Sequence, residues 1–290
     1  MDFLEFVKNN EITLLDGAMG TELKKRDLMG NFKNNIENRD IVKNIHESYL
    51  KVGSDAIITN TFSMNELYLK DKNTDYELAS LNKEGVKIAI EAAGSEHFVL
   101  GDISSTGKLL KPYGEYEEEE FIEVFKEKAK ILADVGVDAF IIETMVDLRE
   151  ALTALKACKN TVDLPVMVSL SYNTIERGGR TVMGNSAAES AQKLQKEGAD
   201  IIGTNCGSLG PKQMAEIVKV IKDNTDLPIM VEPNAGQPKL KGEETVYDMA
   251  PTLFREGIMA CIEAGAKIVG GCCGTTPEHI KELANKIGKR

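Results

Sequence analysis

The chain has 290 residues, 42% of them hydrophobic, which is enough to bury a large core as one domain or as two small ones. Its formal net charge is −11 and no basic patch is interleaved with aromatic residues, so nucleic-acid binding is disfavoured. No run approaches the roughly 18 apolar residues of a membrane span, and the acidic start MDFLEFVKNN is unlike a signal peptide, so we expect a cytoplasmic protein with no membrane partner and reduced thiols.

Short apolar runs recur along the chain, and each ends in a polar or glycine-rich turn. The eight runs are ITLLDGAMG (12–20), DAIITNTF (55–62), FVLGDISSTG (98–107), DAFIIETM (138–145), PVMVSLSYN (165–173), DIIGTNCG (200–207), PIMVEPNAG (228–236) and KIVGGCCGT (267–275). Near-continuous runs rich in isoleucine and valine are typical of parallel strands covered on both faces. The sequence therefore predicts eight buried parallel strands.

The segments between these runs have helical periodicity. In RDIVKNIHESYLKVG, for example, Ile41, Ile45 and Tyr49 fall on one face. Glycine precedes the next strand in the four segments KVGSD (51–55), DVGVD (134–138), KEGAD (196–200) and EAGAK (263–267). Glycine just past a helix is typical of a left-handed cap, so each of these segments is predicted to end a helix.

Strand and helix alternating eight times predicts a single-domain α/β fold, a (β/α)8 TIM barrel that spans residues 1–290. An open doubly wound sheet is the alternative, but DGAMGTEL (16–23) does not match the GxGxxG pattern common after its first strand. Active sites of TIM barrels lie at the C-terminal ends of the strands. The polar and thiol residues predicted there are Asp16, Asn60, Asp102, Glu143, Asn173, Cys206, Glu232, Asn234, Cys272 and Cys273. A single Asp or Asn in this set can be a simple turn-former.

Thiols contribute little to turns, so the cysteines need another explanation. Cys158 and Cys261 have the spacing of core residues on helices and are interpreted as small buried hydrophobes. Cys206, Cys272 and Cys273 remain, at the ends of strands that flank the seventh strand. The adjacent pair could form a vicinal disulfide or be two unrelated buried thiols, but the surrounding glycines allow a kink that turns both sulfurs toward one ion.

Three thiolates are a soft ligand set that suits zinc, with the fourth tetrahedral position left open for catalysis. A closed structural site is the alternative and would need a further Cys or His. The histidines, at 46, 97 and 279, are not placed to supply it. Asn234 ends the strand between the ligands, and we hypothesise that its carbonyl fills the open position at rest.

Seven motifs together resemble the homocysteine S-methyltransferase family. They are LLDGAMGTEL, GSDAIITNTF, GDISSTGKLLKPYG, IIETM, GTNCGSLGP, VEPNAG and GGCCGTTPEHI, and they run in order from about residue 11 to residue 280. The resemblance implies a zinc site in which the thiol of L-homocysteine is activated and methylated to methionine. GDISSTGKLLKPYG and VEPNAG look most like the homocysteine module of cobalamin-dependent methionine synthase.

The same resemblance implies an amino-acid clamp beside the metal. Asp16 and Glu143 match the carboxylates that hold the substrate ammonium, and the backbone N–H groups of Gly17 and Ala18 match those that meet its carboxylate. Asn234 is a less secure member of the substrate site and, like Glu232, could only orient its neighbours. Asp16 capping a turn is the plain structural alternative.

The methyl donor is the open part of the prediction. Relatives use a methyl-corrinoid, a sulfonium compound or betaine; betaine is disfavoured because the chain has no Trp and reads TNTFSMNEL where betaine users have a tyrosine. We expect no room for a cobalamin domain, so a methyl-corrinoid (cobalamin) donor would arrive on a separate corrinoid protein or as free cofactor. A sulfonium donor, or a non-catalytic thiol- and zinc-binding module, are the alternatives. An aldolase-like barrel is disfavoured because no strand ends in a buried lysine.

Overall fold

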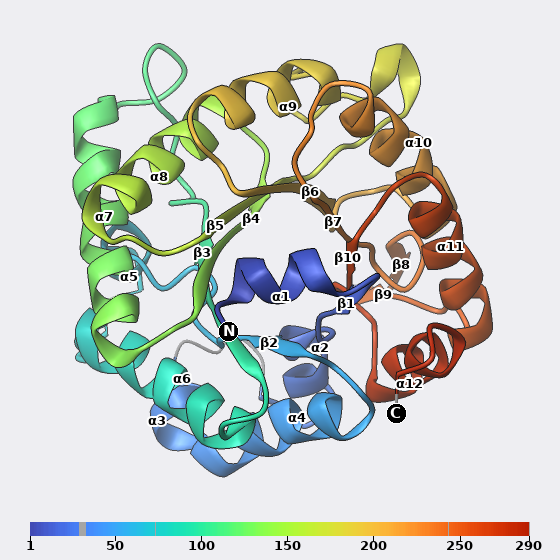
Figure 1. Ribbon diagram of the computed structural model, residues 1–290. Helices are drawn as coiled ribbons and strands as arrows, with labels where there is room; N and C mark the ends of the chain where they lie inside the picture. Colours follow the sequence, from blue (N-terminus) through green and yellow to red (C-terminus); the bar gives the residue numbers. More distant parts are fainter. Residues whose placement is uncertain (29–32, 73, 243, 290) are drawn as a thin grey trace.

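The computed structural model describes residues 1–28, 33–72, 74–242 and 244–289, and these form a barrel of parallel strands ringed by helices (Figure 1). The eight barrel strands are β1 (Thr13–Leu14), β2 (Ala56–Ile58), β3 (Phe98–Ser104), β4 (Ala139–Met145), β5 (Val166–Leu170), β6 (Ile201–Asn205), β7 (Ile229–Glu232) and β10 (Ile268–Val269). They are hydrogen-bonded in the order β1-β10-β7-β6-β5-β4-β3-β2. The predicted single-domain TIM barrel and its eight strands are confirmed.

The longer helices surround the barrel, whereas the short helix α1 lies across one end of it. Their bounds are α1 (Phe3–Asn9), α2 (Met19–Lys24), α3 (Asn34–Glu37), α4 (Arg39–Lys51), α5 (Glu66–Lys70), α6 (Leu78–Ala93), α7 (Glu118–Val135), α8 (Leu148–Thr161), α9 (Ala187–Lys196), α10 (Pro211–Lys222), α11 (Pro251–Glu263) and α12 (Pro277–Lys286). A 3₁₀ turn spans Glu176–Gly178. No helix among the described residues is long and apolar enough to cross a membrane. The four predicted helix-ending glycines all have positive φ, at 53, 136, 198 and 265, and are confirmed.

The short helices α1, α2, α3 and α5 and one hairpin were not predicted. An antiparallel hairpin of β8 (Lys239–Lys241) and β9 (Glu244–Val246) lies in the loop between β7 and α11. Its residues are almost all exposed, so the sequence lacks the apolar alternation that marks a half-buried strand.

Aspartates tie neighbouring strands together at the N-terminal end of the barrel. The Asp55 backbone N–H donates to the Leu14 carbonyl at 2.7 Å, and the Asp55 carboxylate accepts from the Leu14 N–H at 2.7 Å. Asp138 with Val99, and Asp200 with Val166, repeat this pair of bonds. Each of these aspartates follows a helix-ending glycine, so the G-x-D pattern both ends a helix and ties the next strand to its neighbour. The ladder stops between β1 and β2, and there Asp55 joins the two strands instead.

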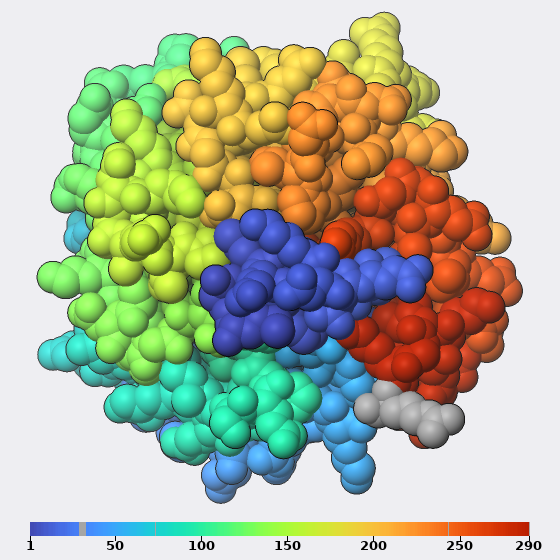
Figure 2. All heavy atoms as spheres, in the orientation of Figure 1, coloured from blue at the N-terminus to red at the C-terminus, as the bar shows by residue number. Residues whose placement is uncertain are grey.

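Helix α1 fills the N-terminal opening of the barrel. Figure 1 shows it lying across the end of the strands, and in Figure 2 its atoms occupy the centre of that face. Phe3 and Val7 are fully buried and belong to the same core cluster as inward-facing strand residues such as Ile141 and Met167. The plug closes one end of the barrel and leaves the C-terminal end for the site.

We expect Phe3→Ala to lower the free energy of unfolding by about 3–5 kcal/mol, because it leaves a cavity beneath the strands. Urea denaturation monitored by circular dichroism measures this. Phe6→Ala is the matched control: Phe6 also contacts Phe98, with ring centroids 5.0 Å apart, but it is only half-buried and should cost clearly less. Equal effects of the two substitutions would contradict the assignment of α1 as a plug held by Phe3.

Candidate active site

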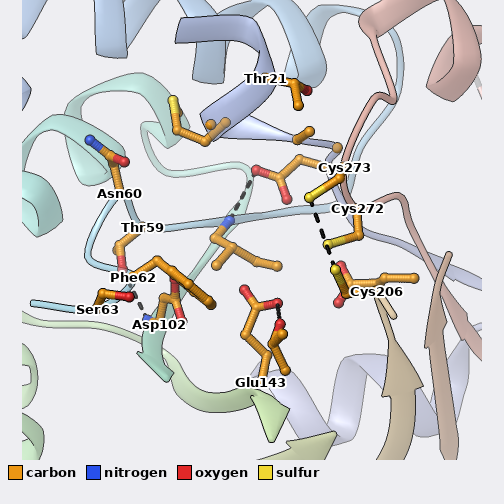
Figure 3. A pocket seen from close by; sticks show the side chains of 18 of the residues that line it. Thr21, Thr59, Asn60, Phe62, Ser63, Asp102, Glu143, Cys206, Cys272 and Cys273 are labelled. Carbon is orange, nitrogen blue, oxygen red and sulfur yellow. Dashed lines mark hydrogen bonds between the residues drawn. The ribbon is translucent and has the colours of Figure 1, made fainter. Parts of the chain in front are cut away.

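A cavity of about 370 Å³ opens at the C-terminal end of the barrel, opposite α1. Its walls come from the ends of β1, β2, β3, β4, β6, β7 and β10, as a TIM-barrel site requires. Figure 3 shows Cys206, Cys272 and Cys273 on one side of it, and Asn60, Phe62 and Asp102 on the other, with Glu143 between them. The cavity is therefore divided into a sulfur side and a mixed polar and apolar side.

The structure brings the three predicted rim cysteines together. Their sulfurs all lie within 4.8 Å of one another, and Cys206 Sγ is 4.0 Å from Cys273 Sγ. The cluster forms because β6, β7 and β10 are neighbours in the sheet. Cys158 and Cys261, predicted to be core residues, are both fully buried in helices, and burial raises the pKa of each thiol to about 12.

Irregular backbone turns the adjacent pair toward Cys206. After β10 the Gly271 N–H donates to the Asp16 carbonyl and the Cys272 N–H donates to the Pro233 carbonyl, so successive residues bond to different neighbouring segments. A Cβ on Gly271 would lie 2.6 Å from the Thr275 side chain, which leaves no room for another residue. Cys206 itself has a left-handed φ of 54°. The glycines predicted to permit a kink do so.

The chemistry of this cluster fits a soft metal ion. The Cys206 and Cys273 sulfurs are within hydrogen-bonding distance, and hydrogen bonds within the cluster lower the pKa of the Cys273 thiol. Asn234 is fully buried and its Nδ2 donates to the Gly207 carbonyl at 2.9 Å, while no described residue donates to its Oδ1. A buried carbonyl oxygen without a donor is available as a ligand.

The histidines are placed as expected. The His279 side chain helps to cap the N-terminus of α12. Its Nδ1 accepts from the Thr276 N–H at 3.2 Å, and its Nε2 is bonded to the Met249 carbonyl oxygen. His46 is buried in the middle of α4, and His97 directly precedes β3. None of the three belongs to the sulfur cluster.

Four carboxyl groups line the cavity: those of Asp16, Asp102 and Glu232 are buried, and that of Glu143 is half-buried. Burial raises the pKa of each, and mutual repulsion with the others raises the pKa of Asp16, Asp102 and Glu232 further. For Glu143 the result is a pKa of about 7, despite hydrogen bonds from Thr144 and Asn205. No described residue donates to either oxygen of Glu232 or to Asp102 Oδ1. These orphaned acceptors point to a cationic ligand.

One buried lysine lies near these carboxyl groups. Lys128 on α7 is the single fully buried Lys or Arg among the described residues, and its Nζ donates to the Thr61 carbonyl at 2.7 Å. Burial lowers its pKa to about 8, whereas the nearby Asp102 acts in the opposite direction. Among the described residues, this one buried lysine therefore accompanies four carboxyl groups.

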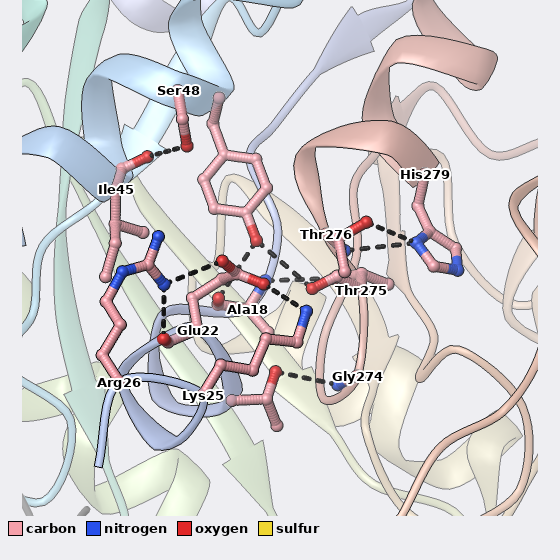
Figure 4. Close-up of polar contacts among 12 residues, drawn as sticks. Ala18, Glu22, Lys25, Arg26, Ile45, Ser48, Gly274, Thr275, Thr276 and His279 are labelled. Atoms are coloured by element: carbon pink, nitrogen blue, oxygen red, sulfur yellow. Dashed lines mark hydrogen bonds and ion pairs between the residues drawn. The ribbon is translucent and has the colours of Figure 1, made fainter. Parts of the chain in front are cut away.

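The Asp16 carboxylate also makes a hydrogen bond within the barrel that the sequence did not reveal. Its Oδ2 accepts from the Ile58 N–H at 3.1 Å, so it joins β1 to β2 at the cavity end, as Asp55 does at the other end. The Ala18 N–H donates to Thr275 Oγ1 at 3.0 Å, and the Tyr49 hydroxyl donates to the Ala18 carbonyl (Figure 4). The Ala18 N–H predicted to meet a substrate carboxylate is thus already engaged, and that part of the prediction depends on Gly17.

Sequence reasoning missed two residues of the site. Asn205, fully buried at the end of β6, contacts both Glu143 and Cys272. Tyr247 follows the β8–β9 hairpin, packs against Gly274 and donates a hydrogen bond to Cys273 that helps to lower the pKa of that thiol. The motif GTNCG drew attention to its cysteine rather than to its asparagine, and the hairpin was not predicted.

Comparison with known proteins gives a consistent result. The sequence model of the homocysteine S-methyltransferase family matches residues 13–287. Methionine synthase of Mycobacterium tuberculosis is 32% identical over 302 residues, and that of Mycobacterium leprae is 31% identical over 295 residues. These alignments cover 97% and 94% of this chain but 25% and 24% of the relatives, so the chain spans about a quarter of their length.

Solved structures support the fold. The metallated form of the homocysteine methyltransferase MmuM from Escherichia coli aligns with a TM-score of 0.81 at 21% identity, over 97% of this chain and 98% of that one. The carboxyl transferase domain of Rhizobium etli pyruvate carboxylase, in its Y628A form, aligns with a TM-score of 0.57 at 12% identity, over 98% of this chain and 48% of that one. Likeness at these identities concerns the barrel alone.

We expect Gly274→Ala to weaken metal binding by at least about tenfold, because the new Cβ would lie 2.2 Å from the Tyr247 Cβ and must displace the cysteine loop. Competition for zinc with a chromophoric chelator measures this. Gly184→Ala is the matched control, since Gly184 also has positive φ but nothing lies within 4 Å of its Cβ position. Unchanged zinc affinity in Gly274→Ala would show that the loop does not depend on this contact.

We expect Glu232→Gln to make the metal-free protein more stable than wild type, by a difference that grows as pH rises. Burial holds the pKa of Glu232 above its unfolded value, so the folded state binds more protons and loses stability between the unfolded and folded pKa values. The glutamine does not titrate, so it should be more stable than the glutamate by a margin that grows from pH 5.5 to pH 8.5. Thermal unfolding from pH 5.5 to 8.5 tests this, with the exposed Glu216→Gln as control; a pH-independent difference would contradict it.

Proposed function

The chain belongs to the homocysteine S-methyltransferase family, and on that premise we propose that its barrel, residues 1–290, binds L-homocysteine and methylates its sulfur to give methionine. The observation that carries this proposal is the position of the three-sulfur cluster at one side of an acidic cavity. The sulfur of a thiol amino acid suits the three-sulfur cluster, and its ammonium suits the acidic cavity.

Cys206, Cys272 and Cys273 would hold a zinc ion, and the purely sulfur donor set supports this choice. A bound zinc ion would lower the pKa of the substrate thiol from its usual value of about 8.5 and keep the sulfur as a thiolate at neutral pH. Asn234, through its unpartnered Oδ1, is the candidate for the remaining position when no substrate is present.

The carboxylates orient the other end of the substrate. Asp16 and Glu143 would pair with the ammonium. The dielectric constant in the cavity is lower than in water, which would strengthen that pairing. The ammonium in turn favours the ionised forms of both carboxyl groups, whose pKa values burial has raised. The Gly17 N–H is the proposed contact for the substrate carboxylate. Binding both ends fixes the sulfur relative to the cavity mouth.

The transfer itself needs little from the side chains beyond this orientation. The thiol proton would pass to solvent water before the transfer, because a zinc-bound thiol would be ionised at neutral pH. The sulfur then uses one of its electron pairs to form the new S–CH₃ bond, while the bond between the methyl group and the donor breaks and its electrons leave with the donor.

Exposed apolar residues support a methyl donor carried by a separate protein, such as a methyl-corrinoid protein. Among the described residues, all exposed large hydrophobic side chains except Met1 lie between a barrel strand and its helix or in that helix's first turn: Ile36, Phe62, Leu109, Tyr113, Ile175, Val182, Leu240 and Leu253. These segments belong to the end of the barrel that contains the cavity. Apolar residues gathered around one opening are typical of a protein-binding face.

A small sulfonium donor is the second candidate, and a different observation favours it. Phe62, Met64 and Tyr68 line the cavity together with Asp102, whose Oδ1 has no donor among the described residues. An apolar wall with one carboxylate suits a sulfonium cation bearing a methyl group. A barrel that binds thiol and zinc without turnover remains the non-catalytic alternative.

The experiment is a donor screen. Zinc-loaded protein and homocysteine are incubated in parallel with methylcobalamin, S-methylmethionine and betaine, and methionine is quantified. We expect methionine from methylcobalamin; methionine from S-methylmethionine alone would overturn the corrinoid proposal in favour of the sulfonium. Cys206→Ser is expected to lose zinc and all turnover, while Cys158→Ser, in the core, should retain both.

Binding separates the remaining outcomes. With cobalt replacing zinc, homocysteine should add a thiolate-to-metal charge-transfer band to the spectrum. A band without methionine from any donor would indicate the non-catalytic module. No band and no methionine would overturn the proposed function.

A further inference from the structure

We propose that Asn205 is a positioning residue for the ammonium end of the substrate: its carboxamide pins a bulge in β4 and thereby aims the Glu143 carboxylate into the cavity. This inference rests on the proposed function, because it assigns Asn205 a part in binding the same substrate. Asn205 lies at the end of β6, directly before the metal-ligand candidate Cys206, and is fully buried.

The bulge is the first step of the argument. The register between β4 and β5 shifts between Ile142 and Met145, so Glu143 and Thr144 leave the regular ladder with β5, while Glu143 stays paired with Ser104 on β3. Thr144 has φ of 59°, a left-handed conformation that is a genuine outlier for a β-branched residue. Strain of this kind persists only where surrounding contacts hold it, and it is concentrated at functional sites.

Asn205 supplies those contacts. Its Oδ1 accepts from the Thr144 N–H at 2.9 Å, and its Nδ2 donates to Thr144 Oγ1 at 2.8 Å. A third bond fixes which way the amide faces, because the Ser169 hydroxyl is 2.6 Å from Oδ1 and donates to it. With Oδ1 occupied by two donors, the NH₂ group is directed at Glu143.

The Glu143 carboxylate is held through one oxygen only. Its Oε2 accepts from Asn205 Nδ2 at 2.6 Å and from the Thr144 hydroxyl at 3.0 Å. No residue in the described parts of the chain donates to Oε1. The arrangement leaves one oxygen fixed and the other free for a ligand, which is what a carboxylate needs in order to receive an ammonium at a defined place.

The distances decide which end of the substrate Asn205 serves. Nδ2 also approaches Cys272 Sγ, at 4.0 Å, the limit for a hydrogen bond to sulfur. The 2.6 Å bond to the carboxylate is far shorter and involves a charged acceptor, so it is the stronger of the two. Loss of the Asn205 donor should therefore affect the ammonium end more than the sulfur end.

The test compares two ligands in two variants. Asn205→Asp preserves shape and the Oδ1 acceptor, but replaces the donor that faces Glu143 with an oxygen. Ser169→Ala removes only the bond that orients the amide and creates almost no cavity. The ligands are homocysteine and 4-mercaptobutyrate, which has the same chain, thiol and carboxylate but no ammonium. Dissociation constants come from the cobalt charge-transfer band, and the same titrations are done on wild type.

We expect Asn205→Asp to weaken homocysteine binding by about tenfold to a hundredfold, as for loss of a hydrogen bond to a charged group, and Ser169→Ala by about threefold to tenfold. Binding of 4-mercaptobutyrate should change by less than about threefold in both. Asn82→Asp and Ser190→Ala make the same chemical changes at fully buried positions on α6 and α9, and should lower stability without changing the ratio of the two affinities.

Equal weakening of both ligands, or none, in Ser169→Ala and Asn205→Asp would overturn the inference. If Asn205→Asp does not fold, Ser169→Ala decides alone. Failure of the inference is distinct from failure of the proposed function, because in the latter case the wild-type protein itself would not bind homocysteine at the metal.

Discussion

Negative charge removed from water is the constraint on which the rest of this structure depends. Four carboxyl groups and three thiols line one cavity, and among the described residues a single fully buried lysine compensates them. Burial and mutual repulsion raise the carboxyl pKa values, so the empty site is costly to ionise. The proposed metal cation at the sulfurs and the proposed ammonium at the carboxylates would each relieve part of this cost.

The barrel can tolerate such a site because its stability is supplied elsewhere. The N-terminal opening is filled by Phe3 and Val7 of α1, and aspartates tie neighbouring strands together at that end. At the cavity end the strands give way to irregular backbone, with left-handed φ at Thr144 and Cys206. Local strain is concentrated where the chemistry is proposed, and regular packing where it is not.

Much of this arrangement could be predicted from the sequence. The eight apolar runs and the G-x-D endings are local patterns, and once they indicate a barrel, the neighbouring positions of β6, β7 and β10 bring Cys206 and the adjacent cysteine pair together. Asn205 could not be predicted in the same way. Its partners Thr144 and Ser169 lie on other strands, and their contacts depend on a bulge that no periodicity reveals. The β8–β9 hairpin escaped because it buries no face.

The seam between β1 and β2 has a dynamic consequence. Regular ladder bonds are missing there among the described residues, and the Asp16 carboxylate, which accepts from Ile58, stands in for them at the cavity end. The same carboxylate is proposed to receive the ligand's ammonium. Local opening of the barrel wall and release of the ligand then draw on one group, so ligand binding should slow amide hydrogen exchange along β1 and β2 more than along β5. Binding of the proposed ligand would therefore restrain local opening of the barrel at the β1–β2 seam.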